Sequence, residues 1–339
     1  MPTIVGKEVG PIGLGLMGGS MNVRLTLLQG FTWRPNPIPT EEAIKVLKAA
    51  LNNGVNLWNG ADFYGPPDNN SLTLLEKYFA KYPEDADKVV LSIKGASGNG
   101  MQPDGSPEGV RKSLDAAIAQ LNGRKKIDLF EPGRIDPNTP LDVTFKVLEE
   151  YVQSGKIGGI GLSEVKASTI QAVSKITKIE SVEVELSLFS LDVLENGVAA
   201  ATAELGIPLV AYSPLSRGFL SGQFKSLDDI PKESLLHHFP RFQPDAFPLN
   251  LELAGQVAEL AKKKGVTVAQ LAISWVVAQS KKAGVPTVIP IPGSTTVARV
   301  EENSKVVDIT DAELAEIEET LKKLPVSGGR YPGFVPIEG

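Results

Sequence analysis

Cysteine is absent from this chain of 339 residues, and histidine is nearly so. The absence of cysteine excludes disulfides and thiolate metal sites. The two histidines, His237 and His238, are neighbours in the sequence, and such a pair is too small a ligand set to indicate a zinc site. We therefore expect a protein that works without a bound metal.

Long apolar runs and long basic runs are also missing. No apolar stretch is long enough to span a bilayer, and the N-terminus, MPTIVGKEVG, lacks the charged-then-apolar pattern of a signal peptide. A net charge of -6 and a pI of about 5.2 argue against nucleic acid or an anionic membrane as partner. We expect a monomer in the cytoplasm, with access to the nucleus possible, that acts on a small molecule.

Short apolar segments of strand type alternate with longer helical patterns along the chain. Most of these segments are continuously apolar, which is typical of parallel strands buried on both faces. Eight successive β/α units favour a closed (β/α)8 barrel, the TIM barrel, over an open sheet. The length of the chain is within the range of a single barrel domain, which we expect to cover residues 1–339. The predicted strands are Ile12–Leu16, Val55–Asn59, Val89–Lys94, Ile127–Glu131, Ile157–Leu162, Val182–Leu186, Pro208–Tyr212 and Thr287–Pro290.

Capping signals mark two of the helices between and after these strands. Ser106 followed by Pro107 is typical of a helix start. Thr310, with Glu313 three residues later, predicts a capping box at the start of the last helix. The long connection after the seventh strand contains the Pro- and Phe-rich stretch His237–Phe247, which we expect to form a mobile loop over the site.

A glycine motif near the N-terminus admits two interpretations. Gly13, Gly15 and Gly18 match the G-x-G-x-x-G pattern of a dinucleotide-binding turn. However, Pro11 interrupts the strand that should precede the turn, and residues 25–34 supply no acidic side chain for a ribose. We favour the alternative, in which the motif is the first barrel strand and its glycines allow tight packing.

Tyr64 and Lys94 follow the second and third predicted strands, where functional residues of a barrel gather. A tyrosine has a pKa of about 10, and a nearby ammonium lowers it by stabilising the phenolate. The pair therefore predicts a general acid at the barrel mouth. Alternatively, Tyr64 packs at the rim and Lys94 is a solvated strand end.

Two segments after the seventh and eighth strands are suited to phosphate. The first runs over residues 211–220, and the second contains Gly293 to Thr296 followed by Arg299. Backbone N–H groups and hydroxyls at such a helix start bind phosphate in many barrels, and an arginine adds a planar fork of donors. The alternative is an ordinary helix cap with a surface arginine.

With these motifs, the chain resembles the aldo-keto reductase family from Gly13 to Asn303. The resemblance implies a (β/α)8 barrel that binds extended NADP(H) without a Rossmann domain. It places Tyr212 against the nicotinamide, Ser163 and Glu164 beside the carboxamide, and residues 213–217 around the pyrophosphate. The residues it assigns to the cofactor are Thr32, Trp33, Ser163, Glu164, Tyr212, Ser213, Pro214, Leu215, Ser216, Arg217, Gly293, Ser294, Thr295, Arg299, Glu302 and Asn303.

The family's catalytic set of Asp, Tyr, Lys and His is only partly present. Tyr64 and Lys94 match, whereas Asn59 stands at the aspartate position and Gly133 at the histidine position. We expect Asn59 to orient Lys94 by hydrogen bonding without pairing its charge. Family positions that often carry Asn and Gln are here Glu164 and Glu183.

These departures, with the segments at residues 31–35, 58–65 and 129–132, resemble the fungal pyridoxal reductase branch. This implies reduction of pyridoxal to pyridoxine by NADPH, with Trp58 and Gly133 in the substrate pocket. Reduction of other aromatic or aliphatic aldehydes is one alternative. A slow-turnover, cofactor-bound regulatory subunit is another. The segment 18–28 has the character of an insertion, and nothing in the sequence explains it.

Overall fold

Eight parallel strands form the barrel that the sequence predicts. The computed structural model describes residues 1–17, 38–66, 68–98 and 102–333. The strands lie in the order β10-β9-β8-β7-β6-β5-β4-β3, and a parallel bridge between Gly15 and Gly293 joins the two end strands. All eight predicted strands are confirmed, with ends shifted by up to three residues. They are β3 (Leu14–Gly15), β4 (Leu57–Ala61), β5 (Val90–Gly95), β6 (Ile127–Pro132), β7 (Ile157–Ser163), β8 (Ile179–Glu185), β9 (Leu209–Tyr212) and β10 (Val288–Pro290).

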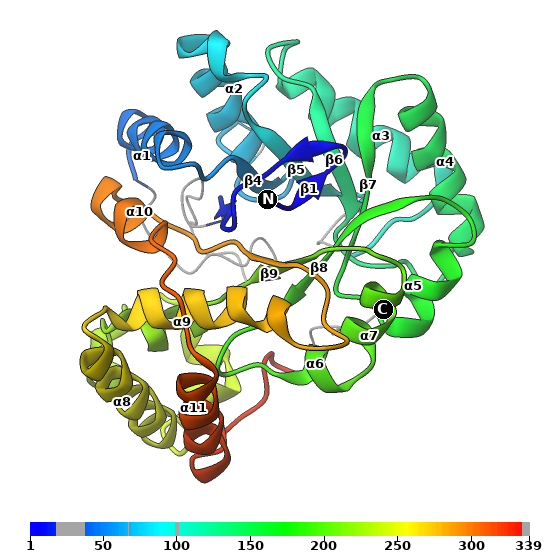
Figure 1. Ribbon diagram of the computed structural model, residues 1–339. Coiled ribbons are helices and arrows are strands. Elements are labelled where there is room, and N and C mark those ends of the chain that lie inside the picture. Colours follow the sequence, from blue (N-terminus) through cyan, green and yellow to red (C-terminus); the bar gives the residue numbers. More distant parts are fainter. Residues whose placement is uncertain (18–37, 67, 99–101, 334–339) are drawn as a thin grey trace.

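Helices form a layer around the strands (Figure 1). Both predicted helix starts are confirmed, since Ser106 caps α3 and Thr310 caps α11 through a capping box. The helices are α1 (Thr40–Asn52), α2 (Ser71–Lys81), α3 (Pro107–Gln120), α4 (Leu141–Gln153), α5 (Ala167–Val173), α6 (Asp192–Glu195), α7 (Val198–Glu204), α8 (Phe247–Lys264), α9 (Val268–Ala278), α10 (Val297–Asn303) and α11 (Asp311–Lys323).

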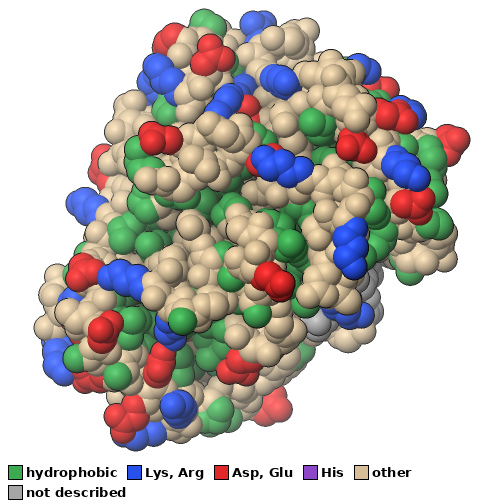
Figure 2. Space-filling view, turned by 45° about the vertical axis from the view of Figure 1, so that its right-hand side comes forward, with side chains coloured by type: hydrophobic (Ala, Val, Ile, Leu, Met, Phe, Trp, Pro, Cys, Tyr) green, Lys and Arg blue, Asp and Glu red, His purple; other side chains and the backbone are tan. Residues whose placement is uncertain are grey.

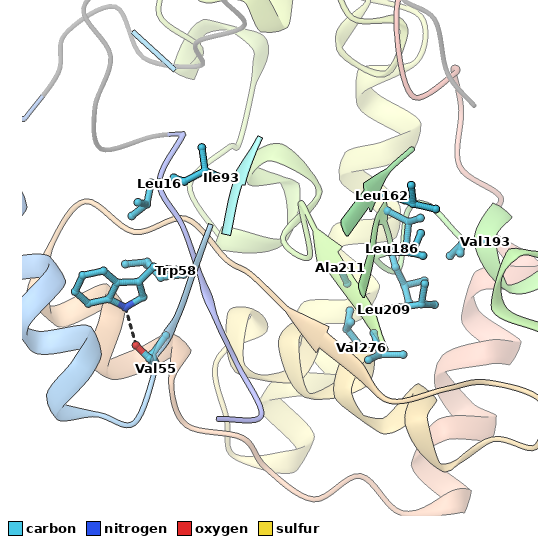
Figure 3. Close-up of a cluster of buried hydrophobic side chains, with 14 of the residues drawn as sticks. Leu16, Val55, Trp58, Ile93, Leu162, Leu186, Val193, Leu209, Ala211 and Val276 are labelled. Atoms are coloured by element: carbon cyan, nitrogen blue, oxygen red, sulfur yellow. Dashed lines mark hydrogen bonds between the residues drawn. The ribbon is translucent and has the colours of Figure 1, made fainter. Parts of the chain in front are cut away.

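The period of two along each strand divides the apolar residues into two cores. On β4, Leu57 joins the inner core, whereas its neighbour Trp58 joins the outer core between strands and helices. Figure 3 shows side chains of the outer core, and the dashed line in it marks the hydrogen bond from the Trp58 ring to the Val55 carbonyl. Inward-facing positions near the carboxyl ends of the strands are polar, and Asn59 on β4 is one of them. The interior of the barrel thus changes from apolar to polar toward the carboxyl ends of the strands, and the site lies at that polar end.

An N-terminal hairpin, which the sequence analysis did not predict, lies against the inner core. Its strands are β1 (Thr3–Ile4) and β2 (Lys7–Glu8), paired antiparallel. Ile4 and Val9 are buried with the inward-facing residues of the barrel strands. Each strand has only two residues, too few for a recognisable hydrophobic period.

The segment 237–247 is not the loop that the sequence predicted. It contains the short 3-10 helices η5 (Leu235–His238) and η6 (Pro240–Phe242), and Phe247 begins α8. Phe239, Phe242 and Phe247 are each 2% exposed and belong to the outer core. The aromatic side chains therefore hold the segment in place, so composition alone misled the prediction.

The glycine motif forms the first barrel strand, as favoured from the sequence. A Cβ at Gly13 would lie 2.7 Å from the Leu57 carbonyl oxygen, and one at Gly15 would lie 2.8 Å from that of Ile291. Neighbouring backbone thus requires glycine at both positions. Gly18 lies outside the described residues.

The face in Figure 2 carries acidic and basic side chains interspersed, which fits the modest net charge of -6. Within the described ranges, no helix is both long enough and apolar enough to cross a bilayer.

Candidate active site

A buried polar cluster lies at the carboxyl ends of β4, β5, β6 and β8. Lys94 on β5 is at its centre and is 4% exposed. Its Nζ donates to both carboxylate oxygens of Glu183, at 2.7 and 2.9 Å, and lies 3.8 Å from Glu131. Burial by itself would lower the pKa of Lys94, but the Glu183 carboxylate raises it above its ordinary value. Lys94 is therefore held as an ammonium.

Asn59 on β4 completes this cluster. Its Oδ1 accepts from Lys94 Nζ at 2.5 Å, so the expected orienting hydrogen bond is present. Its Nδ2 donates to Glu183 Oε2 at 2.5 Å and to Glu131 Oε1 at 3.1 Å. The charge of Lys94, which Asn59 cannot pair, is paired instead by Glu183 from β8.

Burial within the cluster favours the protonated form of Glu131 on β6. Burial raises its pKa well above the ordinary value, and the nearby Glu183 raises it further. Ser92 donates to Glu131 Oε1 at 3.3 Å. The Lys94 ammonium and the Glu183 carboxylate pair directly, and such pairing is how buried charges are tolerated.

Tyr64 lies in the loop after β4 and is half-buried. The Nζ of Lys94 is 5.4 Å from the centroid of its ring, so the predicted pair comes together. The pKa of Tyr64 is nevertheless raised, to about 12, because burial outweighs the opposing effect of Lys94. The sequence prediction of a lowered pKa was therefore wrong in this structure, because it left out desolvation.

Trp58 does not face the predicted substrate pocket. Its side chain is fully buried in the outer core, where it packs against Tyr78 and Phe79 at ring-centroid distances of 5.0 and 6.1 Å. Its Nε1 donates to the Val55 carbonyl at 2.8 Å. Because Asn59 faces inward, the preceding residue on the strand must face outward.

Gly133, at the family histidine position, lies against the ring of Phe63. A Cβ at Gly133 would lie 3.2 Å from two Phe63 ring atoms. That ring in turn packs edge-on against Tyr64, with centroids 5.2 Å apart. Phe63 thus fills the space beside Gly133, so the position is not open to a substrate ring.

We expect Gly133→His to lower kcat/KM for pyridoxal and for 4-nitrobenzaldehyde alike, by roughly tenfold to a hundredfold. An imidazole there displaces Phe63, and the displacement disturbs Tyr64. Gly133→Ala is the matched control, since a small shift of the ring accommodates a methyl group. Steady-state kinetics on both aldehydes makes the comparison. An unchanged or improved Gly133→His enzyme would contradict this packing.

The predicted nicotinamide end is crossed by a C-terminal segment that the sequence analysis missed. The Tyr331 hydroxyl lies 2.8 Å from that of Tyr212 at the end of β9. Arg330 donates to Glu164 at 2.7 Å, and Glu164 also accepts from the backbone N–H of Glu185 at 3.0 Å. Ser163 is buried at the end of β7. The Glu164 carboxylate is therefore already bound by protein donors.

The side chain of Arg217 has a different role from the one the resemblance implied. Its two terminal nitrogens donate to Glu185 at 2.6 and 2.8 Å, and this pair is buried. Its guanidinium lies 4.6 Å from the Tyr331 ring centroid. Pairing with a buried carboxylate keeps this side chain from wrapping a pyrophosphate.

The backbone of the segment 213–217 has an unusual conformation. Ser213, Ser216 and Arg217 have positive φ values of 53°, 51° and 55°. Pro214 and Ser216 are buried, whereas Leu215 is half-buried. Left-handed backbone at non-glycine residues costs energy and concentrates at ligand-binding segments. The main chain of this segment therefore has the kind of conformation found at ligand-binding segments.

The predicted phosphate end lies between β10 and α10. Ser294 and Thr295 are buried, and Asn303 Nδ2 donates to Ser294 Oγ at 3.2 Å. Arg299 is half-buried, and its guanidinium donates to the side-chain oxygen of Gln223 at 2.6 and 2.9 Å, with that amide oriented to match. Hydroxyls and an arginine fork are the donors that a phosphate monoester requires.

The remaining predicted cofactor residues fall into two groups. Gly293 is exposed and pairs with Gly15 in the bridge that closes the barrel, and Glu302 is half-buried on α10. Thr32 and Trp33 lie outside the described residues, as does the segment 18–28.

Comparison with known proteins gives the class. The model of the Aldo/keto reductase family matches residues 28–322. The chain belongs to this family and is therefore an oxidoreductase, with a nicotinamide nucleotide as the family's usual cofactor. A glycerol dehydrogenase structure from Gluconobacter oxydans has the same fold, with a TM-score of 0.79, 22% identity and 98% of each chain covered.

Three relatives are more similar in sequence to this chain than that structure is. The chain is 39% identical to a probable pyridoxal reductase 2 of Schizosaccharomyces pombe, covering 98% of this chain and 97% of the relative. It is 37% identical to a putative pyridoxal reductase of Saccharomyces cerevisiae, covering 90% and 94%. A probable aldo-keto reductase 1 of Glycine max is 33% identical, covering 96% and 89%.

Proposed function

We propose that this protein reduces pyridoxal to pyridoxine with NADPH. The observation that carries the proposal is the placement of Tyr64 beside the buried Lys94 ammonium at the barrel mouth, where the ring centroid lies 5.4 Å from Nζ. Near-full-length similarity to two proteins named as pyridoxal reductases supports the choice of substrate.

When bound, NADPH would supply the hydride that the aldehyde carbon receives. Tyr64 donates its phenolic proton to the carbonyl oxygen, which becomes the alcohol of the product. The phenolate that remains lies beside Lys94, whose ammonium stabilises it. A pKa of about 12 keeps Tyr64 protonated, and so able to donate, at neutral pH.

We also propose that the 2′-phosphate of NADPH binds at Ser294, Thr295 and Arg299. Tyr212, Ser163 and the main chain of residues 213–217 line the nicotinamide and pyrophosphate side, with Glu302 and Asn303 toward the adenine. Arg299 is hydrogen-bonded to the exposed, uncharged amide of Gln223, and no carboxylate in the described part of the chain lies within ion-pair distance of its guanidinium. A phosphate can therefore take the place of the amide.

Replacing Arg299 by alanine is expected to weaken NADPH binding by about 1.5–3 kcal/mol, the worth of one charge-assisted contact. NADH, which has no 2′-phosphate, should lose much less. Fluorescence titration with both cofactors measures the difference, and Gln223→Ala serves as a control that keeps the arginine. Equal losses of binding free energy for NADPH and NADH would show that Arg299 does not bind the 2′-phosphate.

Turnover of the wild-type enzyme on an aldehyde panel tests the proposed function. Pyridoxal should be reduced over many turnovers with free exchange of cofactor. A slow single turnover with retained cofactor would favour a regulatory subunit instead. Rapid reduction of other aldehydes but not pyridoxal would keep the enzyme class and change the substrate.

A further inference from the structure

We infer that Glu183 has taken over the family aspartate's part as the charge partner of Lys94, and that Asn59 is its necessary companion. Glu183 is then a positioning residue for the reaction. This inference rests on the proposed function. Glu183 stands where the resemblance places a carboxamide-binding glutamine, and Asn59 stands at the aspartate position. The two changes together move one negative charge from β4 to β8.

The contacts of Lys94 identify Glu183 as that partner. Both carboxylate oxygens of Glu183 lie within 2.9 Å of Nζ, and the two side chains are 5% and 4% exposed. The other nearby carboxyl, Glu131, is 3.8 Å away. Attraction between charges grows as distance and solvent exposure fall. Glu183 is therefore the group that holds Lys94 protonated.

The hydrogen bonds of Asn59 explain why asparagine accompanies a glutamate at position 183. Its oxygen accepts from Lys94, while its nitrogen donates to Glu183, both at 2.5 Å. A carboxamide can accept and donate at once, whereas an ionised aspartate can only accept. An aspartate at position 59 would set a second carboxylate against Glu183, and two carboxylates in contact do not both ionise.

Exchange of the two groups between strands tests this inference. Among the described residues, Glu183→Gln leaves Lys94 with the more distant carboxyl of Glu131, so kcat should fall by roughly ten- to a hundredfold, as expected when an acid-base group is disturbed. The upper apparent pKa of kcat should also fall, because loss of a carboxylate disfavours the ammonium. Asn59→Asp alone should also lower kcat, by bringing like charges into contact.

The double variant Asn59→Asp with Glu183→Gln should recover most of the wild-type kcat and pH profile. In it, the carboxylate returns to β4 and the carboxamide moves to β8. Glu180→Gln, at the other end of β8 and paired with Lys178, is the matched control and should resemble the wild type. The thermal unfolding temperature can be measured without turnover. It should fall in each single variant and return toward the wild-type value in the double variant.

Two results would overturn the inference: wild-type kinetics and stability for Glu183→Gln, or a double variant no better than the worse single variant. The kinetics use whichever aldehyde the wild-type enzyme reduces, so a wrong substrate assignment leaves the comparison intact. If the wild-type enzyme reduces no aldehyde, the proposed function fails, and the unfolding cycle alone decides whether Asn59 and Glu183 act together.

Discussion

Replacing Tyr64 by phenylalanine is expected to lower kcat by roughly 10²-fold or more while cofactor binding stays near that of the wild type. Phenylalanine keeps the ring and its edge-on packing with Phe63 but removes the proton that the carbonyl oxygen must receive. Burial raises the pKa of Tyr64 to about 12, so loss of its proton should not limit the wild-type rate between neutral pH and pH 9.

Stopped-assay kinetics with pyridoxal and a fluorescence titration with NADPH separate the two effects. Tyr82→Phe offers a control, because Tyr82 ends α2 and its ring lies near Lys48, away from the barrel mouth. Near-normal turnover in Tyr64→Phe would exclude it as the general acid. Loss of cofactor binding in parallel with turnover would instead indicate a disturbed site.

Replacing Glu185 by glutamine is expected to lower the free energy of unfolding by about 3–5 kcal/mol, as when one partner of a buried ion pair is removed. Glu185 is fully buried and accepts two hydrogen bonds from Arg217. Arg241 and Arg330 approach it at 3.8 and 3.9 Å. Glutamine leaves Arg217 and Arg241 without the carboxylate they face, whereas Arg330 keeps its ion pair with Glu164.

The stability of the wild type should also depend on pH through Glu185. Burial alone would raise its pKa, but Arg217, Arg330 and Arg241 together lower it below the ordinary value. A lowered pKa means that the unfolded chain takes up the proton first, so this stabilisation is present above the ordinary pKa of glutamate and is lost as pH falls through the folded value. Glu185→Gln should lack this dependence.

Chemical denaturation across acidic pH measures both quantities. Glu316→Gln breaks an exposed pair with Lys263 and should cost less than about 1 kcal/mol, which is the usual worth of a surface pair. If Glu185→Gln is no less stable than this control, the arginines have found other partners and the account of this cluster is wrong.

The barrel itself could be predicted from the sequence because its strands are short apolar runs in regular alternation with helices. The period of two also contained information that the sequence analysis did not use. Once Asn59 is assigned to the barrel mouth, Trp58 must face the helices, and its removal from the substrate pocket follows without a structure. The hairpin at residues 3–8 was beyond prediction, because such short strands have no pattern.

The charge arrangement of the site could not be predicted, because it depends on which strands face each other across the closed barrel. Glu183 and Lys94 are 89 positions apart, and no local pattern links them. The same holds for Arg330 and Glu164, 166 positions apart. An available signal was that Glu183 and Glu185 stand two positions apart in an otherwise apolar run, which indicates a shared inward face.

The most direct test of the proposed function is kcat/KM of the wild-type enzyme for pyridoxal and a panel of other aldehydes, each with NADPH and with NADH, followed by cofactor absorbance and product analysis. We predict that pyridoxal with NADPH gives the highest kcat/KM of the panel and that pyridoxine is the product. No NADPH oxidation with pyridoxal, under conditions in which another aldehyde is reduced, would contradict the proposal.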